Sequence, residues 1–351
     1  MVASYHEKID IINKIKLSKQ LEHLPPYCAD FFRGIEPNTA SGTRVAYAYD
    51  LQRFFRYLLE RNTHFVEVND ISLEYIENLS IEAFEDYMQY LKYKVKDGSI
   101  KLINTNSGIS RKISTLKSFY NYMIKTQRIN HNSTLYINLP KIYPKEIIRL
   151  EPDEIVRLLD LVESGDILSI SQRKYHEKTK VRDLAILTVL LGTGIRISEC
   201  IGLDINDINF RTCGMSIHRK GGKEVTVYFG EEVNRALLNY LKQRNEICTL
   251  PGHEQALFLS MRRSRISISA VENLVKKYSH FITPLKKITP HKLRSTYGTS
   301  LYRVTGDIYL VADVLGHTDV NTTRKHYAAI EEDRRRNARN VVKLRINQLA
   351  K

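Results

Sequence analysis

The sequence is poor in the residues that build metal centres and disulfide frameworks. Only four of its 351 residues are cysteines, and Cys28, Cys200, Cys213 and Cys248 are scattered without CxxC spacing. Such cysteines suggest neither a zinc site nor a disulfide scaffold, so we expect reduced and mostly buried thiols. Neither a DxD-type pair of acids nor a His/Cys cluster suggests a metal site, and we expect no cofactor.

Long hydrophobic runs are also missing. The longest, around Leu184–Leu191, is far shorter than the roughly 20 residues that span a bilayer. A charged start followed by an apolar stretch and a cleavage site is absent, so we see no signal peptide. A long basic amphipathic helix with bulky apolar anchors, which would favour a membrane surface, is absent too. We therefore expect a cytoplasmic protein with no membrane partner.

Negative charge is scarce, because 39 Asp and Glu stand against 54 Lys and Arg, a net charge of +15. Such an excess attracts polyanions such as DNA, although a merely basic soluble protein has the same balance. The distribution favours nucleic acid, since between Arg262 and Arg294 nine basic residues accompany a single acid, Glu272. The candidate DNA contacts are Arg262, Arg263, Arg265, Lys276, Lys277, Lys286 and Lys287. Contacts of this kind bind phosphates and need not read bases.

The first half of the chain has helical periodicity. Residues 1–24 are polar without a strong period, and we interpret them as an N-terminal arm or a loose helix. Residues 25–140 carry apolar stripes at helical spacing, which predict a small helical domain. Its helices are expected after a cap at Asn38-Thr39, after Ser80, and over 107–124.

The second half begins after an extended linker at 141–148, where prolines and β-branched residues interrupt the helical pattern. A helix is expected to start at Glu151-Pro152, since acids and an early proline suit a helix N-terminus. We assign residues 149–332 to a second domain and 333–351 to a C-terminal tail.

Within the second domain, polarity alternates on both sides of Gly221-Gly222 and predicts a two-stranded hairpin over 215–229. The polar, basic residues 163–182 are predicted to form a surface loop. Further helices are expected over 231–246, 267–282, 290–302, 307–315 and 320–330. The predicted fold class is mainly α with a small β-sheet.

Four short stretches carry polar groups that can perform chemistry. They are "GTGIRISEC", the hairpin tip "HRKGGKE", "PHKLRST" and "LGHTDVNTTRKHY". Their candidate residues are Arg196, Lys220, His291, Arg294, His317 and Tyr327. Each has an ordinary structural explanation when taken alone. Arg196 can pair with Glu199, Lys220 can be a solvated hairpin cation, and Tyr327 is one of 21 tyrosines.

Together these residues fit the cleavage of a phosphodiester. Guanidinium groups bind the non-bridging oxygens, on which negative charge develops, without losing their own charge. A lysine can protonate a departing alkoxide, and a tyrosine hydroxyl can attack the phosphorus once cations stabilise its charge. The set therefore predicts strand cleavage through a phosphotyrosine, with the protein's own cations in place of a metal.

The four stretches resemble, in order, the boxes of the tyrosine recombinases, the phage-integrase type of site-specific DNA recombinase. "PNTASGTRVAYAYDLQRFFRYL" also looks like the opening of that family's helical domain, so the resemblance covers about 27–330. It implies an N-terminal helical core-binding (SAM-like) domain and a C-terminal α+β catalytic domain. The implied partner is double-stranded DNA with a specific recombination site.

The resemblance also implies a role for each residue. Arg196 and Arg294 bind the scissile phosphate, while His291 and His317 bond its oxygens or manage protons. Lys220 protonates the leaving 5′-oxygen, with Lys223 as its rival, and Tyr327 becomes joined to the 3′-phosphate.

The family implies a homotetramer on two DNA sites, with DNA-bending or directionality factors as candidate accessory proteins. Integration, excision and dimer resolution all use this chemistry and stay open. Two alternatives also remain. A type IB topoisomerase uses similar chemistry as a monomer, and a non-catalytic DNA-binding protein can keep the same fold.

Overall fold

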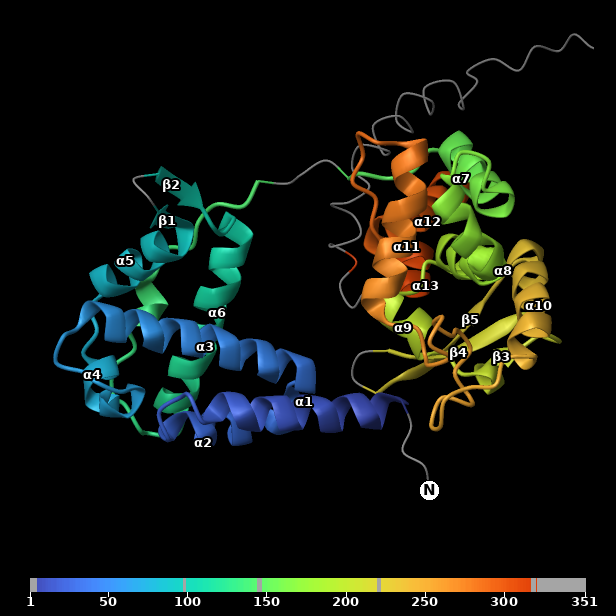
Figure 1. Cartoon of the computed structure of the whole chain (residues 1–351). Helices are drawn as coiled ribbons and strands as arrows, with labels where there is room; N and C mark the ends of the chain where they lie inside the picture. The colour runs from blue at the N-terminus through green and yellow to red at the C-terminus, as the bar shows by residue number, and fades with distance from the viewer. Residues whose placement is uncertain (1–4, 97–98, 144–146, 220–221, 317–319, 321–351) are drawn as a thin grey trace, which may run out of the picture. The chain divides into compact units, whose positions relative to one another are not determined.

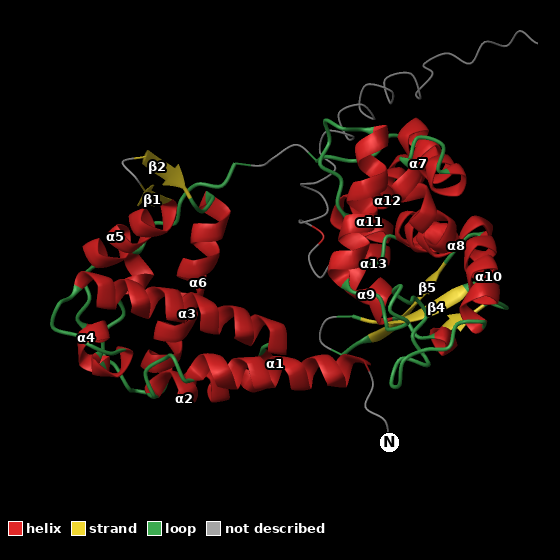
Figure 2. Ribbon diagram, in the orientation of Figure 1, coloured by secondary structure: helices red, strands yellow, loops and turns green. Residues whose placement is uncertain are grey.

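The computed structural model describes residues 5–96, 99–143, 147–219, 222–316 and 320. Within them the chain divides into two compact units, Met1–Lys145 and Glu146–Lys351. Helices dominate both units, as Figure 2 shows, and strands make only small sheets. No helix in the described part of the chain is long and apolar enough to span a membrane.

The first unit is helical, with one small hairpin (Figure 1). Its helices are α1 (Tyr5–Leu21), α2 (Tyr27–Ile35), α3 (Ser41–Arg61), α4 (Leu73–Glu77), α5 (Ile81–Lys92) and α6 (Asn106–Lys125). Strands β1 (Tyr93–Lys96) and β2 (Ser99–Leu102) pair antiparallel. Short 3-10 helices cover Glu36–Asn38, Val68–Asp70 and Ser133–Tyr136.

Buried aromatic side chains form the core of this unit. Phe54 packs on Phe84 and Tyr87, and all three are at most 1% exposed. The apolar residues of α3 and α6 recur every three or four positions, so each helix presents one continuous face to this core. Residues 5–21 also form a helix, and Leu17 of α1 joins the same core.

The second unit combines a three-stranded antiparallel sheet of order β3–β4–β5, at one end of the unit, with helices (Figure 1). Its strands are β3 (Ile208–Asn209), β4 (Gly214–His218) and β5 (Glu224–Tyr228). Its helices are α7 (Pro152–Ser164), α8 (Ile170–Thr193), α9 (Ile197–Gly202), α10 (Glu231–Asn245), α11 (Ile268–Ile282), α12 (Pro290–Thr305) and α13 (Ile308–Leu315). A short 3-10 helix covers Ile205–Asp207.

Most predicted elements of this unit are confirmed. The hairpin β4–β5 and helices α7, α10, α11, α12 and α13 lie within a few residues of their predicted positions. The helix expected over 320–330 falls almost wholly outside the described residues. The structure therefore confirms the mainly α fold class with a small sheet.

The predicted surface loop over 163–182 is wrong. Residues from Ile170 onward belong to α8, which runs unbroken into the buried apolar stretch of 183–191. A capping box starts this helix, because the Ser169 hydroxyl accepts from the Gln172 N–H and the Gln172 side chain accepts from the Ser169 N–H. The polar composition reflects an exposed first half of a helix, not a loop.

Candidate active site

A tight turn between α8 and α9 introduces the first candidate residue. Gly194 ends α8 with φ +63°, in the left-handed region that favours glycine. A Cβ at Gly194 would lie 2.4 Å from Cδ1 of Tyr297, so the position also lacks room for a side chain. The turn places Arg196 at the N-cap of α9.

Arg196 is held by a buried carboxylate. Its backbone N–H donates to Glu199 Oε2 and its Nη1 to Glu199 Oε1, both at 2.7 Å. The side chain of Glu199 is 4% exposed, whereas that of Arg196 is 38% exposed. Arg196 Nη2 also donates to the carbonyl of Gly316 at 3.1 Å. The ion pair considered from the sequence is therefore present, and the guanidinium additionally reaches the end of α13.

Arg294 lies on α12 and is buried. Its Nη1 donates to the carbonyl of Gly194 at 2.7 Å, and its Nη2 donates to the carbonyl of Leu315. The structure thus brings Arg196 and Arg294 to adjacent carbonyls at the C-terminus of α13. Of the six residues grouped from the sequence, these two therefore lie together in the structure.

His291 occupies the first turn of α12, three residues before Arg294, and is exposed. Pro290 at the first helical position starts this helix, as expected from its fixed φ. The His291 imidazole is thus exposed to solvent on the same helix as Arg294, a candidate for phosphate binding.

Arg219, at the end of β4, is a member of this site that the sequence did not reveal. Its Nη1 donates to the carbonyl of Asp313 at 3.1 Å and its Nη2 to that of Val314 at 2.7 Å. Burial lowers the pKa of this guanidinium, and the neighbouring Arg196 acts in the same direction. In the sequence Arg219 is one more cation of a basic hairpin, so no signal singles it out.

The end of α13 therefore collects positive charge. Carbonyls in the last turn of a helix have no partner within the helix and carry the negative end of its dipole. Here the four carbonyls of 313–316 all accept from arginines, and Glu199 is the one carboxylate paired with these arginines among the described residues. Three guanidiniums outnumber the two carboxylates that act on them, Glu199 and Asp313, and the resulting positive excess favours binding of an anion.

Three other sequence candidates, Lys220, His317 and Tyr327, lie outside the described residues. Lys223, the alternative to Lys220 as general acid, is exposed directly before β5. Its carbonyl accepts from the Arg219 N–H at 2.8 Å. No group of three or more potential metal-ligating side chains occurs in the part of the chain that the structure describes.

The seven basic residues proposed to contact DNA fall into two groups. Arg265 pairs with Asp204, Lys286 pairs with Glu154, and Lys277 lies 4.3 Å from the ring centre of Tyr278. Burial lowers the pKa of Lys277. The exposed members are Arg262, Arg263, Lys276 and Lys287. These four are the better candidates for phosphate contacts, since the others already have partners within the protein.

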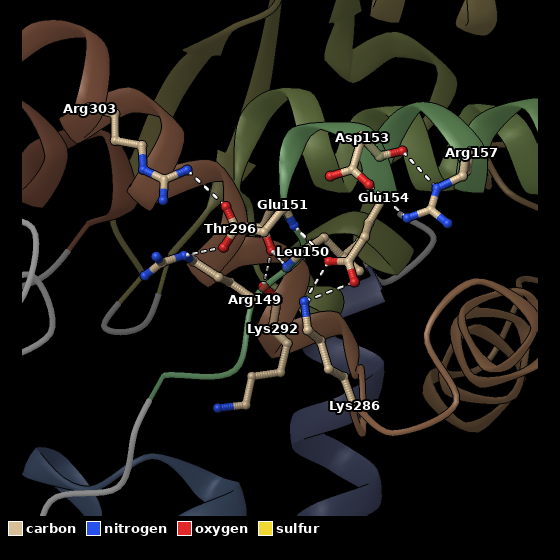
Figure 3. Close-up of polar contacts among 10 residues, drawn as sticks. All are labelled: Arg149, Leu150, Glu151, Asp153, Glu154, Arg157, Lys286, Lys292, Thr296 and Arg303. Atoms are coloured by element: carbon tan, nitrogen blue, oxygen red, sulfur yellow. Dashed lines mark hydrogen bonds and ion pairs between the residues drawn. The ribbon is translucent and has the colours of Figure 1, made fainter.

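Polar contacts fix the start of the second unit against α12 (Figure 3). The Leu150 N–H donates to Thr296 Oγ1 at 3.0 Å, and Arg303 Nη1 donates to Glu151 Oε2 at 3.1 Å. Lys286 Nζ donates to both oxygens of Glu154, at 2.8 and 2.6 Å. Residues 150–154 therefore brace the helix that carries His291 and Arg294.

The chain is similar to known proteins over most of its length. Residues 149–334 match the model of the phage integrase family. Tyrosine recombinase XerC of Caldanaerobacter subterraneus subsp. tengcongensis is 32% identical over 333 residues, covering 90% of this chain and 86% of that protein. Tyrosine recombinase XerS of Lactococcus lactis subsp. cremoris is 30% identical over 345 residues, covering 90% and 96%.

Solved structures are similar in fold. XerH site-specific recombinase bound to palindromic difH substrate, in a post-cleavage complex, matches with a TM-score of 0.64 at 18% identity, over 86% of this chain and 80% of that one. The Tn1549 transposon integrase in complex with transposon right end DNA matches with a TM-score of 0.62 at 18% identity, over 90% and 99%.

Proposed function

Because the chain belongs to the phage integrase family of tyrosine recombinases, it is a site-specific DNA recombinase, and we propose that Arg196 and Arg294 bind the scissile phosphate. The observation that supports this assignment is their convergence on the Gly316 and Leu315 carbonyls. The guanidinium of Arg196 has five N–H donors, more than its contacts to Glu199 and Gly316 occupy, so donors remain on it for phosphate oxygens.

In the proposed reaction, the Tyr327 hydroxyl attacks the phosphorus and loses its proton, for which His291 and His317 are the candidate acceptors. The bond from phosphorus to the 5′-oxygen breaks, and Lys220 donates a proton to that oxygen. The 3′-phosphate stays bonded to Tyr327, which conserves the energy of the broken bond. A 5′-hydroxyl of a partner strand then attacks the phosphotyrosine, joins the strands and releases the tyrosine.

Tyr327→Phe tests this assignment directly. The variant should form no covalent protein–DNA adduct with a nicked duplex, yet it should bind the duplex nearly as well as wild type does, because the change removes a hydroxyl and no charge. Denaturing electrophoresis of the trapped complex measures the adduct. An adduct in the phenylalanine variant, or a linkage at Tyr302 or Tyr309, would contradict the proposal.

We further propose that the partner is double-stranded DNA with a specific recombination site, on which four copies assemble across two sites in the cytoplasm. The net charge of +15 supports an affinity for DNA. We include accessory proteins, which bend DNA or set the direction of recombination, as further candidate partners. Sequencing the DNA recovered with the trapped adduct would identify the site.

A further inference from the structure

The last turn of α13 binds arginines from three separate elements, and one of them has no role in the proposed chemistry. Arg294 and Arg196 bind the carbonyls of Leu315 and Gly316, while Arg219 binds the two carbonyls before them. We propose that Arg219 is a positioning residue for strand cleavage. It fixes the end of α13, so that the carbonyls of Leu315 and Gly316 orient the guanidiniums of Arg294 and Arg196. This inference rests on the proposed phosphate-binding role of those two arginines.

The backbone of Arg219 is fixed as firmly as its side chain. Its N–H donates to the Lys223 carbonyl at 2.8 Å, and its carbonyl accepts from the Gly222 N–H at 3.2 Å. These bonds continue the ladder in which His218 pairs with Glu224. The backbone of Arg219 is therefore fixed at the end of β4, and its side chain reaches the end of α13, 94 residues later in the chain.

The environment of this guanidinium differs from that of a solvated surface cation. Both terminal nitrogens bind carbonyls, and Nε is buried with no hydrogen-bond partner among the described residues. Withdrawing a cation from water is unfavourable, and the attraction of Glu199 and Asp313 offsets this cost and the repulsion of Arg196 only in part. Binding to the negative end of a helix offsets this cost, which ties Arg219 to that one location.

Gly316 links Arg219 to Arg196 by close contact. A Cβ on Gly316 would lie 2.3 Å from Arg219 Nη1 and 2.5 Å from its Cζ, so the guanidinium lies directly against this backbone. The carbonyl of the same residue accepts from Arg196. Loss of the Arg219 side chain would therefore leave the turn unsupported on one side, so that the Gly316 carbonyl that orients Arg196 is free to move.

A loosened turn should affect the rate of cleavage more than DNA affinity. Misplacement of a catalytic group by about 1 Å can reduce a rate on the order of 100-fold. Affinity, in contrast, is a sum over many phosphate contacts across the protein. The expected signature is a slow enzyme that still binds its DNA.

The test compares Arg219→Met, which keeps the bulk of the side chain but removes its donors, with Arg219→Lys, which keeps the charge. Arg211→Met is the matched control, because Arg211 is an exposed arginine in the turn between β3 and β4. For each variant, the rate of adduct formation at saturating DNA, the Kd for a half-site and the thermal midpoint are measured.

Arg219→Met should form the adduct at least tenfold more slowly, an order-of-magnitude expectation for displaced groups, while Kd changes by no more than about twofold. Arg219→Lys should recover part of the rate, and Arg211→Met should match wild type. The loss should be the same on a substrate whose bridging 5′-oxygen is replaced by sulfur, because the arginines act on the non-bridging oxygens.

Three results would overturn the inference. They are a wild-type rate for Arg219→Met, a defect that the sulfur-bridged substrate removes, and losses of rate in both Arg219 variants that only match losses of folded protein. Arg196→Lys and Arg294→Lys are measured alongside. If they cleave normally, the proposed function itself fails; if they are defective while Arg219→Met is normal, only the positioning role is excluded.

Discussion

An arginine that forms an ion pair within the protein can still serve a ligand. Arg196 pairs with the buried carboxylate of Glu199 and yet keeps its side chain 38% exposed. Hydrogen bonds to Glu199 and to the Gly316 carbonyl restrict the rotation of the guanidinium, so less freedom is lost when an anion binds. The pair that explains Arg196 structurally would thus also prepare it for the phosphate binding that we propose.

The arginines of the site and the exposed lysines should behave differently on mutation. Arg196→Lys or Arg294→Lys should slow cleavage on the order of 100-fold at saturating DNA, as for other preorganised charge-stabilising groups. Lys276→Ala, at an exposed position of α11, should instead weaken affinity and reduce its salt dependence. Single-turnover cleavage and salt titrations measure both. Similar effects of the two classes on cleavage at saturating DNA would contradict this division.

Lys220 should act on the leaving group and not on binding. Lys220→Ala should cleave normal DNA poorly, but it should cleave sulfur-bridged DNA nearly as fast as wild type does, since a thiolate needs little protonation to leave. Lys223→Ala is the matched comparison. If Lys220→Ala is equally slow on both substrates, Lys220 is not the general acid, and the same pattern of rescue in Lys223→Ala would assign the role there.

At the scale of single residues, the sequence points to candidate catalytic groups but not to the residues that hold them in place. Arg196 and Arg294 stand in recognisable boxes, and the structure brings them together. From the sequence, Glu199 is recognised only as an ion-pair partner of Arg196, and Arg219 is not recognised. Arg219, which we propose to position other residues, makes its contacts 94 residues away in the sequence, and no local sequence pattern predicts such contacts.

At the scale of the elements, the loop that leads into α12 is held by an ion pair between Lys286 and Glu154 in the first turn of α7. Burial alone would raise the pKa of Glu154, but hydrogen bonds from Lys286 and from the Glu151 backbone outweigh it, and the pKa lies below its ordinary value of 4.5. A carboxyl whose pKa is lowered by folding stabilises the protein above its unfolded pKa, and the effect is lost as the pH falls through the folded pKa.

Lys286→Met should therefore reduce the free energy of unfolding in a pH-dependent way. The expected loss is on the order of 1–2 kcal/mol at pH 7, because Glu154 stays buried without its partner, and it should shrink below about pH 4.5 as Glu154 is protonated. Arg157→Met is the control, since its pair with Asp153 is exposed and should contribute about 0.5 kcal/mol or less. Urea denaturation at several pH values measures the difference. A loss for Lys286→Met that is unchanged between pH 7 and pH 3 would show that the pair does not stabilise the fold electrostatically.

Helix caps explain which element boundaries could be predicted. Ser80 caps α5 as expected, by accepting from the Ala83 N–H. The cap predicted at Asn38-Thr39 is wrong, because Glu36–Asn38 forms a 3-10 helix and Ala40, without a side-chain bond, precedes α3. Hairpin β1–β2 was not predicted either, since its eight residues are too short for a clear alternation.

On the scale of the whole molecule, the tail provides a test of assembly. Residues 333–351 lie outside the described part of the chain, and their sequence carries an apolar set too small to fold alone. The set is Val341, Val342, Leu344, Ile346 and Leu349. It can fold back on its own domain or dock on a neighbouring copy. We favour docking, because a head-to-tail contact closes into a ring.

Deletion of residues 338–351 should leave binding to one half-site largely unchanged, yet reduce formation of the two-site complex and recombination. Gel-shift titrations on single and paired sites, together with a recombination assay, distinguish these steps. Recombination at the wild-type level, or failure of the truncated chain to bind a single half-site, would rule out docking between copies.

The last turn of α13, which binds three arginines, also affects when the protein can become active during its synthesis. Arg196 and Arg219 meet carbonyls that follow them by 120 and about 94 residues. Contacts between such distant residues require large loops to close first, so they form late in folding. A nascent chain that has emerged as far as the hairpin carries both arginines but has no α13 to orient them. Such a chain already has cations that attract DNA, whereas the ability to cut it must wait until α13 is made and packed.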